Sequence, residues 1–312
     1  MVIPSARNDI AHELYPFTSR FFDRGDGIRM HYVDEGPREA PTVVFVHGNP
    51  TWSFYFRDLV RAVSPTHRAI AVDHVGCGLS DKPGDDRYRY TLASRIDDLE
   101  ALLEHAGVKG DVTLVVHDWG GAIGMGWAVR HPERITRLVV LNTAAFHLPR
   151  GKALPGLLWL ARDTAVGAFL VEKLNAFAIG ASLIGTPRRK MAKDVKAGYL
   201  APYARPGDRL ATLRFVQDIP LSAADEAWAP LMEIEAKLPT LADKPMLICW
   251  GEKDFVFDHH FLQEWQRLFP AAEVHAYPTA GHYILEDAGD LVVPLVRAFL
   301  GRTASVEQSV GA

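Results

Sequence analysis

A single aspartate separates an apolar run from a glycine-rich segment in VVHDWGG, residues 115–121. The apolar run predicts a strand and the glycines predict a closely packed helix start, so Asp118 lies in the sharp turn between them. A carboxylate that attacks saturated carbon forms an ester, which water can cleave, whereas a serine there would form a stable ether. Asp118 is therefore a candidate nucleophile for displacement at saturated carbon. The alternative is that Asp118 only caps the helix that follows.

Two further residues could form a triad with Asp118. Asp254 follows the apolar run PMLICWG (245–251), and His282 lies in AGHYILED (280–287), after the last apolar run. The order nucleophile, acid, base along the chain is the one expected when the nucleophile sits in a strand-turn-helix elbow. His282 would then take a proton from water, and Asp254 would hold the imidazole in the required tautomer.

Neutral hydrogen-bond donors are expected on either side of the carboxylate. The loop VFVHGNP (44–50) and the residue after the nucleophile supply the two backbone N–H groups of an oxyanion hole, here from Asn49 and Trp119. The side-chain amide of Asn49 and the indole N–H of Trp119 are uncharged donors that suit a leaving anion in a dry pocket. An uncharged, apolar substrate is therefore indicated.

The elements that must position these residues alternate along the chain. An antiparallel hairpin is expected in 21–36, and helices are expected over 91–107, 120–134 and 291–300. Continuous apolar runs of strand length, typical of a parallel sheet covered on both faces, occupy 42–48, 68–74, 112–118, 135–142, 245–251 and 272–278. This alternation predicts an α/β fold, with a mostly parallel eight-stranded sheet flanked by helices.

One stretch, residues 146–230, contains no convincing strand and several helix-like segments. We expect it to form a helical cap, inserted into a main domain made of residues 1–145 and 231–312. The apolar residues of the cap and of the loops near it would line the pocket; the candidates are Phe146, Leu148, Trp159, Phe169, Phe177, Leu213, Phe215 and Val256.

At this point the chain resembles the haloalkane dehalogenases of the α/β-hydrolase superfamily. The resemblance covers nearly the whole chain and is carried by HGNPTWSF (47–54), DHVGCGLSDKP (73–83), HDWGGAIGMGWAVRHP (117–132), WGEKDFVF (250–257) and AGHYILED (280–287). It implies Asp118 as the nucleophile, His282 as the base, Asp254 as the acid, and Asn49 with Trp119 as the halide-binding pair.

The position of the acid and the type of halide pair resemble those of the third dehalogenase subfamily. In another branch the acid follows the sixth strand, but here that place holds Asn142, so Asp254 must serve. The third subfamily overlaps in sequence with bacterial β-lactone decarboxylases of olefin biosynthesis. The cap segments NAFAIGAS (175–182), APYARPGDR (201–209) and RFVQDIPLSAADEAW (214–228) are similar to those decarboxylases too.

The main prediction is hydrolytic dehalogenation of apolar haloalkanes through an alkyl ester of Asp118. The alternatives are a β-lactone decarboxylase that forms cis-olefins, an epoxide hydrolase that uses Tyr199 and Tyr203 as acids, and a non-catalytic binding protein. A second halide contact from the cap could come from Trp228 or Trp159.

The composition of the chain limits the kinds of molecule that it is expected to bind. Lys and Arg number 34 against 38 Asp and Glu, so the net charge of −4 offers no basic excess for nucleic acid. The 13 histidines show no HExxH or Cys/His ligand spacing, so neither a metal nor a cofactor is expected. Residues 1–17 lack the apolar run of a signal peptide, and the longest uncharged run of the cap is short for a membrane span. The expected partners are an apolar small molecule, water and a halide ion, in the cytoplasm.

Overall fold

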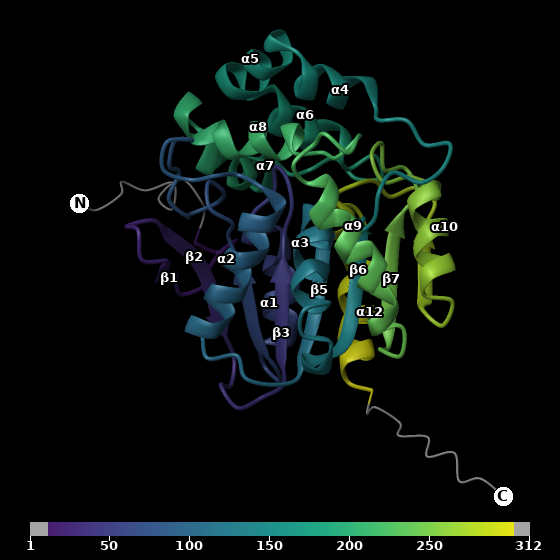
Figure 1. Ribbon diagram of the computed structural model, residues 1–312. Coiled ribbons are helices and arrows are strands. Elements are labelled where there is room, and N and C mark those ends of the chain that lie inside the picture. Colours follow the sequence, from purple (N-terminus) through teal and green to yellow (C-terminus); the bar gives the residue numbers. More distant parts are fainter. Residues whose placement is uncertain (1–11, 303–312) are drawn as a thin grey trace, which may run out of the picture.

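The computed structural model describes residues 12–302, so most of the N-terminal segment considered above lies outside it (Figure 1). Eight strands form one sheet: β1 (Arg20–Asp23), β2 (Arg29–Glu35), β3 (Thr42–Val46), β4 (Arg68–Val72), β5 (Val112–Asp118), β6 (Ile135–Thr143), β7 (Met246–Gly251) and β8 (Glu273–Tyr277). Their order is β1-β2-β4-β3-β5-β6-β7-β8. The pairs β1–β2 and β2–β4 are antiparallel and the other pairs are parallel. The predicted hairpin and mostly parallel sheet are confirmed.

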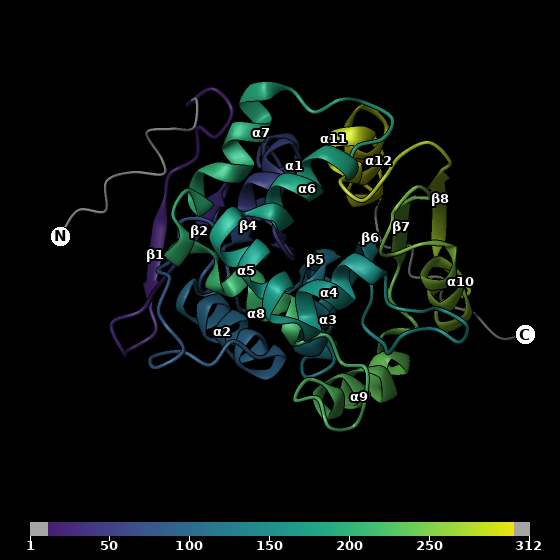
Figure 2. The same cartoon turned by 90° about the horizontal axis from the view of Figure 1, so that it is seen from above.

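Helices cover both faces of the sheet (Figure 2). One face carries α2 (Leu92–His105), α3 (Trp119–Ala128), α9 (Trp228–Lys237) and α10 (His259–Leu268), and the other carries α1 (Arg57–Val63), α11 (Ile284–Asp287) and α12 (Gly289–Leu300). Successive residues of β5 belong to different core clusters, because Leu114 and Val116 pack on the first face and Val115 on the second. Helix α3 is shorter than predicted, since a 3-10 turn at Pro132–Arg134 precedes β6.

The segment predicted as a cap holds α4 (Gly156–Asp163), α5 (Ala165–Leu174), α6 (Ala176–Ile184), α7 (Lys193–Leu200) and α8 (Leu210–Gln217). These helices lie above the carboxyl ends of the parallel strands (Figure 1). Helix α9 crosses the predicted boundary at residue 230 and packs against α2 and α3 rather than against the cap helices. The carboxyl ends of the strands and the cap thus enclose the region where the candidate catalytic loops emerge.

Within residues 12–302, no single helix is long and apolar enough to cross a membrane. Helices α5 and α6 together reach that length and apolarity, but they meet at a bend of 80°.

The turn between β5 and α3 leaves no room for a side chain at residue 120. Asp118 has φ 53, in the left-handed region, and a Cβ on Gly120 would lie 1.9 Å from the carbonyl oxygen of Val46. Strand β3 and the start of α3 therefore approach each other backbone to backbone, which holds Asp118 close to the loop that follows β3.

We expect Gly120→Ala to lower the free energy of unfolding by about 3 kcal/mol, because the added methyl group meets backbone that cannot move aside. Urea denaturation measures this. Gly180→Ala, in α6, is the matched control: a Cβ there meets no atom within 4 Å. The control should be unchanged, or more stable by up to about 1 kcal/mol. Equal stability of the two variants would contradict the close approach.

Candidate active site

The three predicted triad residues meet at the carboxyl ends of their strands. Asp118 is the last residue of β5, Asp254 follows β7, and His282 lies in the loop between β8 and α11. The Nδ1 atom of His282 lies 2.8 Å from Oδ2 of Asp254, and its Nε2 atom lies 3.6 Å from Oδ2 of Asp118. All three side chains are buried. The imidazole thus lies between the two carboxylates, which is the arrangement that a base and its orienting acid require.

Backbone N–H groups hold the Asp118 carboxylate. The N–H of Asn49 donates to Oδ1 at 2.5 Å, and the nearby N–H of Trp119 also favours the charged form of this carboxyl group. The side chain makes no capping hydrogen bond to α3, so the cap interpretation does not describe it. Burial raises the pKa of Asp118 above its ordinary value, while His282 and the two N–H donors favour the charged form and limit the rise.

His282 has two opposing influences on its charge. Burial lowers its pKa, but the neighbouring charge of Asp254, the hydrogen bond to it and the charge of Asp118 raise the pKa further, so the net shift is upward. Two aromatic rings, Phe255 and Phe257, lie 5.9 Å from the imidazole, centroid to centroid. These rings cover part of the His282 imidazole. On the backbone of the same residue, Nε2 of His117 contacts the carbonyl oxygen of His282 at 2.9 Å.

Asn142 has a role that the sequence did not reveal. Its Nδ2 atom donates to Oδ2 of Asp254 at 3.0 Å, and its Oδ1 atom accepts from the N–H of Gly251 at 2.8 Å. The N–H groups of Val256 and Phe257 donate to the other oxygen of Asp254. Asn142 therefore fixes the Asp254 carboxylate and joins the end of β6 to the end of β7.

We expect Asn142→Leu to lower the free energy of unfolding by about 1–3 kcal/mol, because the buried N–H of Gly251 and the Asp254 carboxylate each lose a partner. Turnover should fall about tenfold, since His282 is then oriented by a looser carboxylate. Urea denaturation and steady-state kinetics measure the two effects. Unchanged turnover in the folded variant would show that the orientation of Asp254 does not depend on Asn142.

The side chains of Asn49 and Trp119 both border the cavity above Asp118. Nδ2 of Asn49 donates to the carbonyl oxygen of Thr212 at 3.1 Å, which uses one of its two N–H bonds. The indole N–H of Trp119 meets no hydrogen-bond acceptor in the part of the chain that the structure describes. The structure thus leaves two neutral donors for an anion, one N–H from each residue.

An apolar cavity of about 120 Å³, partly open to solvent, lies between these residues and the cap. Asp118 and His282 are part of its wall, and most of the remainder is apolar. Wall residues that the sequence analysis did not single out include Leu154, Leu158, Ala181, Val216, Ile219, Pro220 and Leu231.

Four of the eight predicted pocket residues line this cavity: Phe146, Leu148, Phe177 and Val256. The other four predictions need correction. Trp159 and Phe169 are more than half exposed on the outer side of α4 and α5, because these short helices turn other residues inward. Leu213 packs into a small core inside the cap, and Phe215 lies behind Trp119, 5.6 Å away between ring centroids.

The proposed second halide donors also lie elsewhere. Trp159 is exposed. Trp228 packs against His147, with the tilted rings 4.2 Å apart between centroids, and does not border the cavity. The two tyrosines of the epoxide hydrolase alternative are likewise occupied. Tyr199 donates to Oε1 of Glu286 at 2.6 Å, and Tyr203 donates to the carbonyl oxygen of Thr51 at 3.3 Å. Neither tyrosine is part of the cavity wall, so neither can protonate an epoxide bound above Asp118, as that alternative requires.

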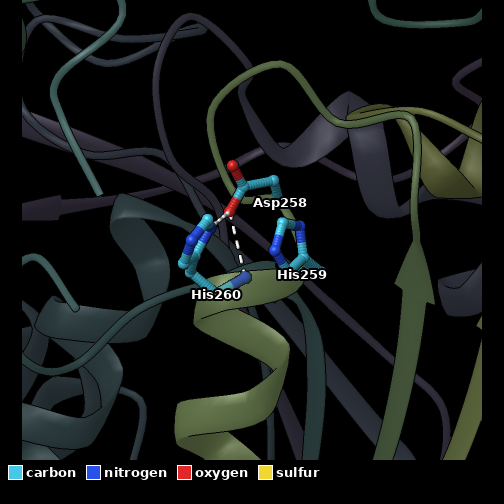
Figure 3. Close-up of side chains that lie close together, drawn as sticks. All are labelled: Asp258, His259 and His260. Carbon is cyan, nitrogen blue, oxygen red and sulfur yellow. Dashed lines mark hydrogen bonds and ion pairs between the residues drawn. The ribbon is translucent and has the colours of Figure 1, made fainter. Parts of the chain in front are cut away.

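A group of possible metal ligands, Asp258, His259 and His260, lies outside this site at the start of α10 (Figure 3). The Asp258 carboxylate caps the helix by accepting from the N–H of His260 at 3.0 Å, and it also pairs with Lys152 at 2.7 Å. These contacts account for the Asp258 carboxylate.

Known proteins are similar to this chain in sequence and in fold. The α/β hydrolase fold family matches residues 41–289. A cis-3-alkyl-4-alkyloxetan-2-one decarboxylase of Shewanella oneidensis is 52% identical over 95% of this chain and 92% of its own length. The same enzyme of Xanthomonas campestris is 48% identical over 92% of this chain and 97% of its own length.

Haloalkane dehalogenases are more distant. That of Mycolicibacterium paratuberculosis is 33% identical over 89% of this chain and 90% of its length. The crystal structure of the haloalkane dehalogenase DbeA from Bradyrhizobium elkani is 27% identical, covers 91% of this chain and 97% of its own, and superimposes with a TM-score of 0.78. The chain therefore belongs to the haloalkane dehalogenase family of the α/β-hydrolase superfamily, in the region where that family overlaps with the β-lactone decarboxylases.

Proposed function

We propose that this enzyme is a β-lactone decarboxylase that converts a cis-3,4-dialkyl oxetan-2-one into a cis-olefin and CO₂. The observation that carries the proposal is a buried carboxylate, Asp118, in the wall of an apolar cavity, in a chain about half identical to two decarboxylases of such lactones. Because those relatives are nearer in sequence than the dehalogenases, this alternative replaces hydrolytic dehalogenation as the preferred function.

In the first step, Asp118 attacks C4 of the lactone ring, the saturated carbon bonded to the ring oxygen. A bond forms between Oδ2 and C4, and the strained C4–O bond breaks. Its electron pair stays on the ring oxygen, which becomes part of a free carboxylate. The neutral donors of Asn49 and Trp119 border the cavity where this charge appears. The raised pKa of His282 favours its protonated form, which would add a cationic donor.

In the second step, the bond between C3 and the new carboxylate breaks and releases CO₂. The electron pair of that bond forms the C3=C4 double bond, and the C4–O bond to Asp118 breaks, which restores the carboxylate. Attack inverts C4, and departure of the two groups from opposite sides then gives the cis-olefin from the cis-lactone. This step consumes no water. Because His282 is buried, little water reaches the ester, which favours loss of CO₂ over hydrolysis.

The two activities differ in what they require of His282, and this predicts different pH profiles. Hydrolysis of an alkyl ester needs the neutral imidazole as a base, so it fails as the pH falls below the raised pKa of His282. Decarboxylation needs no base and should continue below that pH. Both stop at lower pH, as Asp118 is protonated around its own raised pKa. Rates of olefin and halide formation, measured between about pH 4 and pH 9, test this difference.

The direct test is incubation of the purified enzyme with a cis-3,4-dialkyl oxetan-2-one, with gas chromatography of the organic phase and quantification of CO₂. We expect equal amounts of cis-olefin and CO₂, and neither from Asp118→Ala. A β-hydroxy acid as the sole product, from hydrolysis of the lactone or of the Asp118 ester, would refute the proposal.

Dehalogenation stands as the second candidate, on one specific observation. The indole N–H of Trp119 borders the cavity and has no acceptor among the described residues, which suits a halide as well as a carboxylate. Halide release from 1-bromobutane, followed by ion chromatography, tests it. Turnover of bromobutane at a rate well above that of the lactone would make haloalkanes the preferred substrates.

A further inference from the structure

The outer side of the cap is unusually apolar. Six large apolar side chains of α4, α5 and α6, which we call the cap face, are more than half exposed: Leu157, Trp159, Val166, Phe169, Leu174 and Leu183. In the rest of residues 12–302, Met232 alone among large apolar side chains is exposed to that extent. A concentration of this kind marks an interaction site rather than ordinary surface.

The cap face is the outermost layer of the molecule on the side of the catalytic loops. Helices α4, α5 and α6 lie side by side at the top of Figure 1, and Figure 2 shows them uncovered when seen from above. Each has ten residues or fewer, too short to span a bilayer. Contact with a lipid surface would therefore be in its plane, as with interfacial helices.

A second apolar cavity, of about 150 Å³, opens between these three helices. The exposed residues Leu157 and Ile184 belong to its wall, so it reaches the surface at the cap face. Its wall shares Leu158, Phe177, Ala181 and Phe255 with the cavity above Asp118. The shared side chains lie between the two cavities, along the path that an apolar molecule would follow from the cap face to the active site.

A basic segment flanks the cap face. Residues 188–196, directly after α6, carry five basic residues and a single acidic one, Asp194. Arg188 and Arg189 pair with Asp290, but Lys190 and Lys193 are exposed and form no ion pair within the described residues. Exposed lysines beside an apolar surface provide the second of the two signals that stable binding to anionic lipid needs.

We propose that the cap face and this basic segment dock the enzyme on an anionic phospholipid surface, and that the cavity between α4, α5 and α6 admits substrate from it. The charge of the flanking segment favours anionic lipid. A second copy of the chain seated on the face would cover the cavity mouth, whereas a lipid layer would supply apolar molecules to it. The delivery of substrate rests on the proposed function, since a lactone with two long alkyl chains partitions into lipid.

The test is sedimentation of the full chain with vesicles of phosphatidylcholine containing about one third phosphatidylglycerol, a proportion that gives a strongly anionic surface. Wild type should sediment with these vesicles. Val166→Glu/Leu183→Glu should lower the partition coefficient at least about tenfold, because charge enters the apolar face. Lys190→Glu/Lys193→Glu should lower it by a similar factor on anionic vesicles only.

Met232→Glu/Leu291→Glu is the matched control, since it places the same two charges at exposed apolar sites on α9 and α12. This variant should bind vesicles like wild type. The proposal is overturned if wild type stays in the supernatant, or if the cap-face and control variants bind equally. It is also overturned if analytical ultracentrifugation shows a wild-type dimer that only the cap-face variant dissociates, since the occupant is then a second copy.

Activity on short-chain cis-3,4-diethyl oxetan-2-one, which dissolves in water, separates this proposal from the proposed function. The cap-face variant should convert it at the wild-type rate while losing activity on vesicle-borne long-chain lactone. If wild type converts neither lactone, the proposed function fails, while vesicle binding still decides the docking surface.

Discussion

Asp118→Asn should abolish olefin formation, with a loss of at least about 1000-fold in turnover. An amide has the shape of the carboxylate and can still accept the N–H of Asn49, so the elbow between β5 and α3 should keep its structure. It lacks the negative charge that attacks C4, and removal of a covalent nucleophile costs far more than removal of a binding contact. Gas chromatography of the olefin measures the loss.

Asp258→Asn is the control for this experiment, because Asp258 is a helix-capping carboxylate outside the cavity wall. It should keep nearly full turnover, with only a small loss of stability. More than a tenth of wild-type activity in a correctly folded Asp118→Asn enzyme would mean that another group attacks the substrate.

His282→Phe should separate the two candidate chemistries. With 1-bromobutane, Asp118 is alkylated but the ester is not hydrolysed, so steady-state halide release falls about 100- to 10,000-fold, the usual worth of a general base. One butyl group should remain on Asp118, seen by intact-mass spectrometry. With the β-lactone, the ester ends in olefin and CO₂ without water, so no stable adduct should persist.

The substitution should leave the fold intact. A phenyl ring has nearly the size of imidazole and joins Phe255 and Phe257, while Asp254 keeps its hydrogen bonds from Asn142, Val256 and Phe257. His259→Phe, at an exposed position, is the control and should behave as wild type. A butyl adduct that hydrolyses in His282→Phe as fast as in wild type would exclude His282 as the base.

Local sequence patterns predicted the scaffold because each element carries its own signal. Strands buried on both faces read as continuous apolar runs, and β3, β4, β5 and β7 are buried along their whole length. The carboxyl ends of parallel strands meet at one edge, so the residues that follow β3, β5, β7 and β8 had to converge there. This geometry accounts for the meeting of Asp118, Asp254 and His282.

The cap was less predictable, because the sequence of a short helix does not show which of its sides faces the rest of the protein. Trp159 and Phe169 have the residue types of a pocket, but each lies on the outer side of its helix. Which side faces inward depends on how α4, α5 and α8 pack on one another, and α4 and α5 carry apolar residues on their exposed as well as their buried sides. A helix with no polar face gives no periodic signal to orient it.

The role of Asn142 was hidden for a different reason. Its partners, Gly251 and Asp254, follow it by more than 100 residues, and only the adjacency of β6 and β7 brings them together. A hydrogen bond across neighbouring strand ends leaves no mark in local spacing. Knowledge of the strand order would have been enough to suggest it.

The central claim is that the carboxylate of Asp118 forms a covalent bond to C4 of the lactone, and rapid-quench mass spectrometry tests it most directly. Excess enzyme is mixed with a cis-3,4-dialkyl oxetan-2-one, quenched in acid and digested. We predict that the peptide containing Asp118 gains the full mass of the lactone and loses it as olefin appears. Olefin that forms with no such adduct, or an adduct on another residue, would contradict the claim.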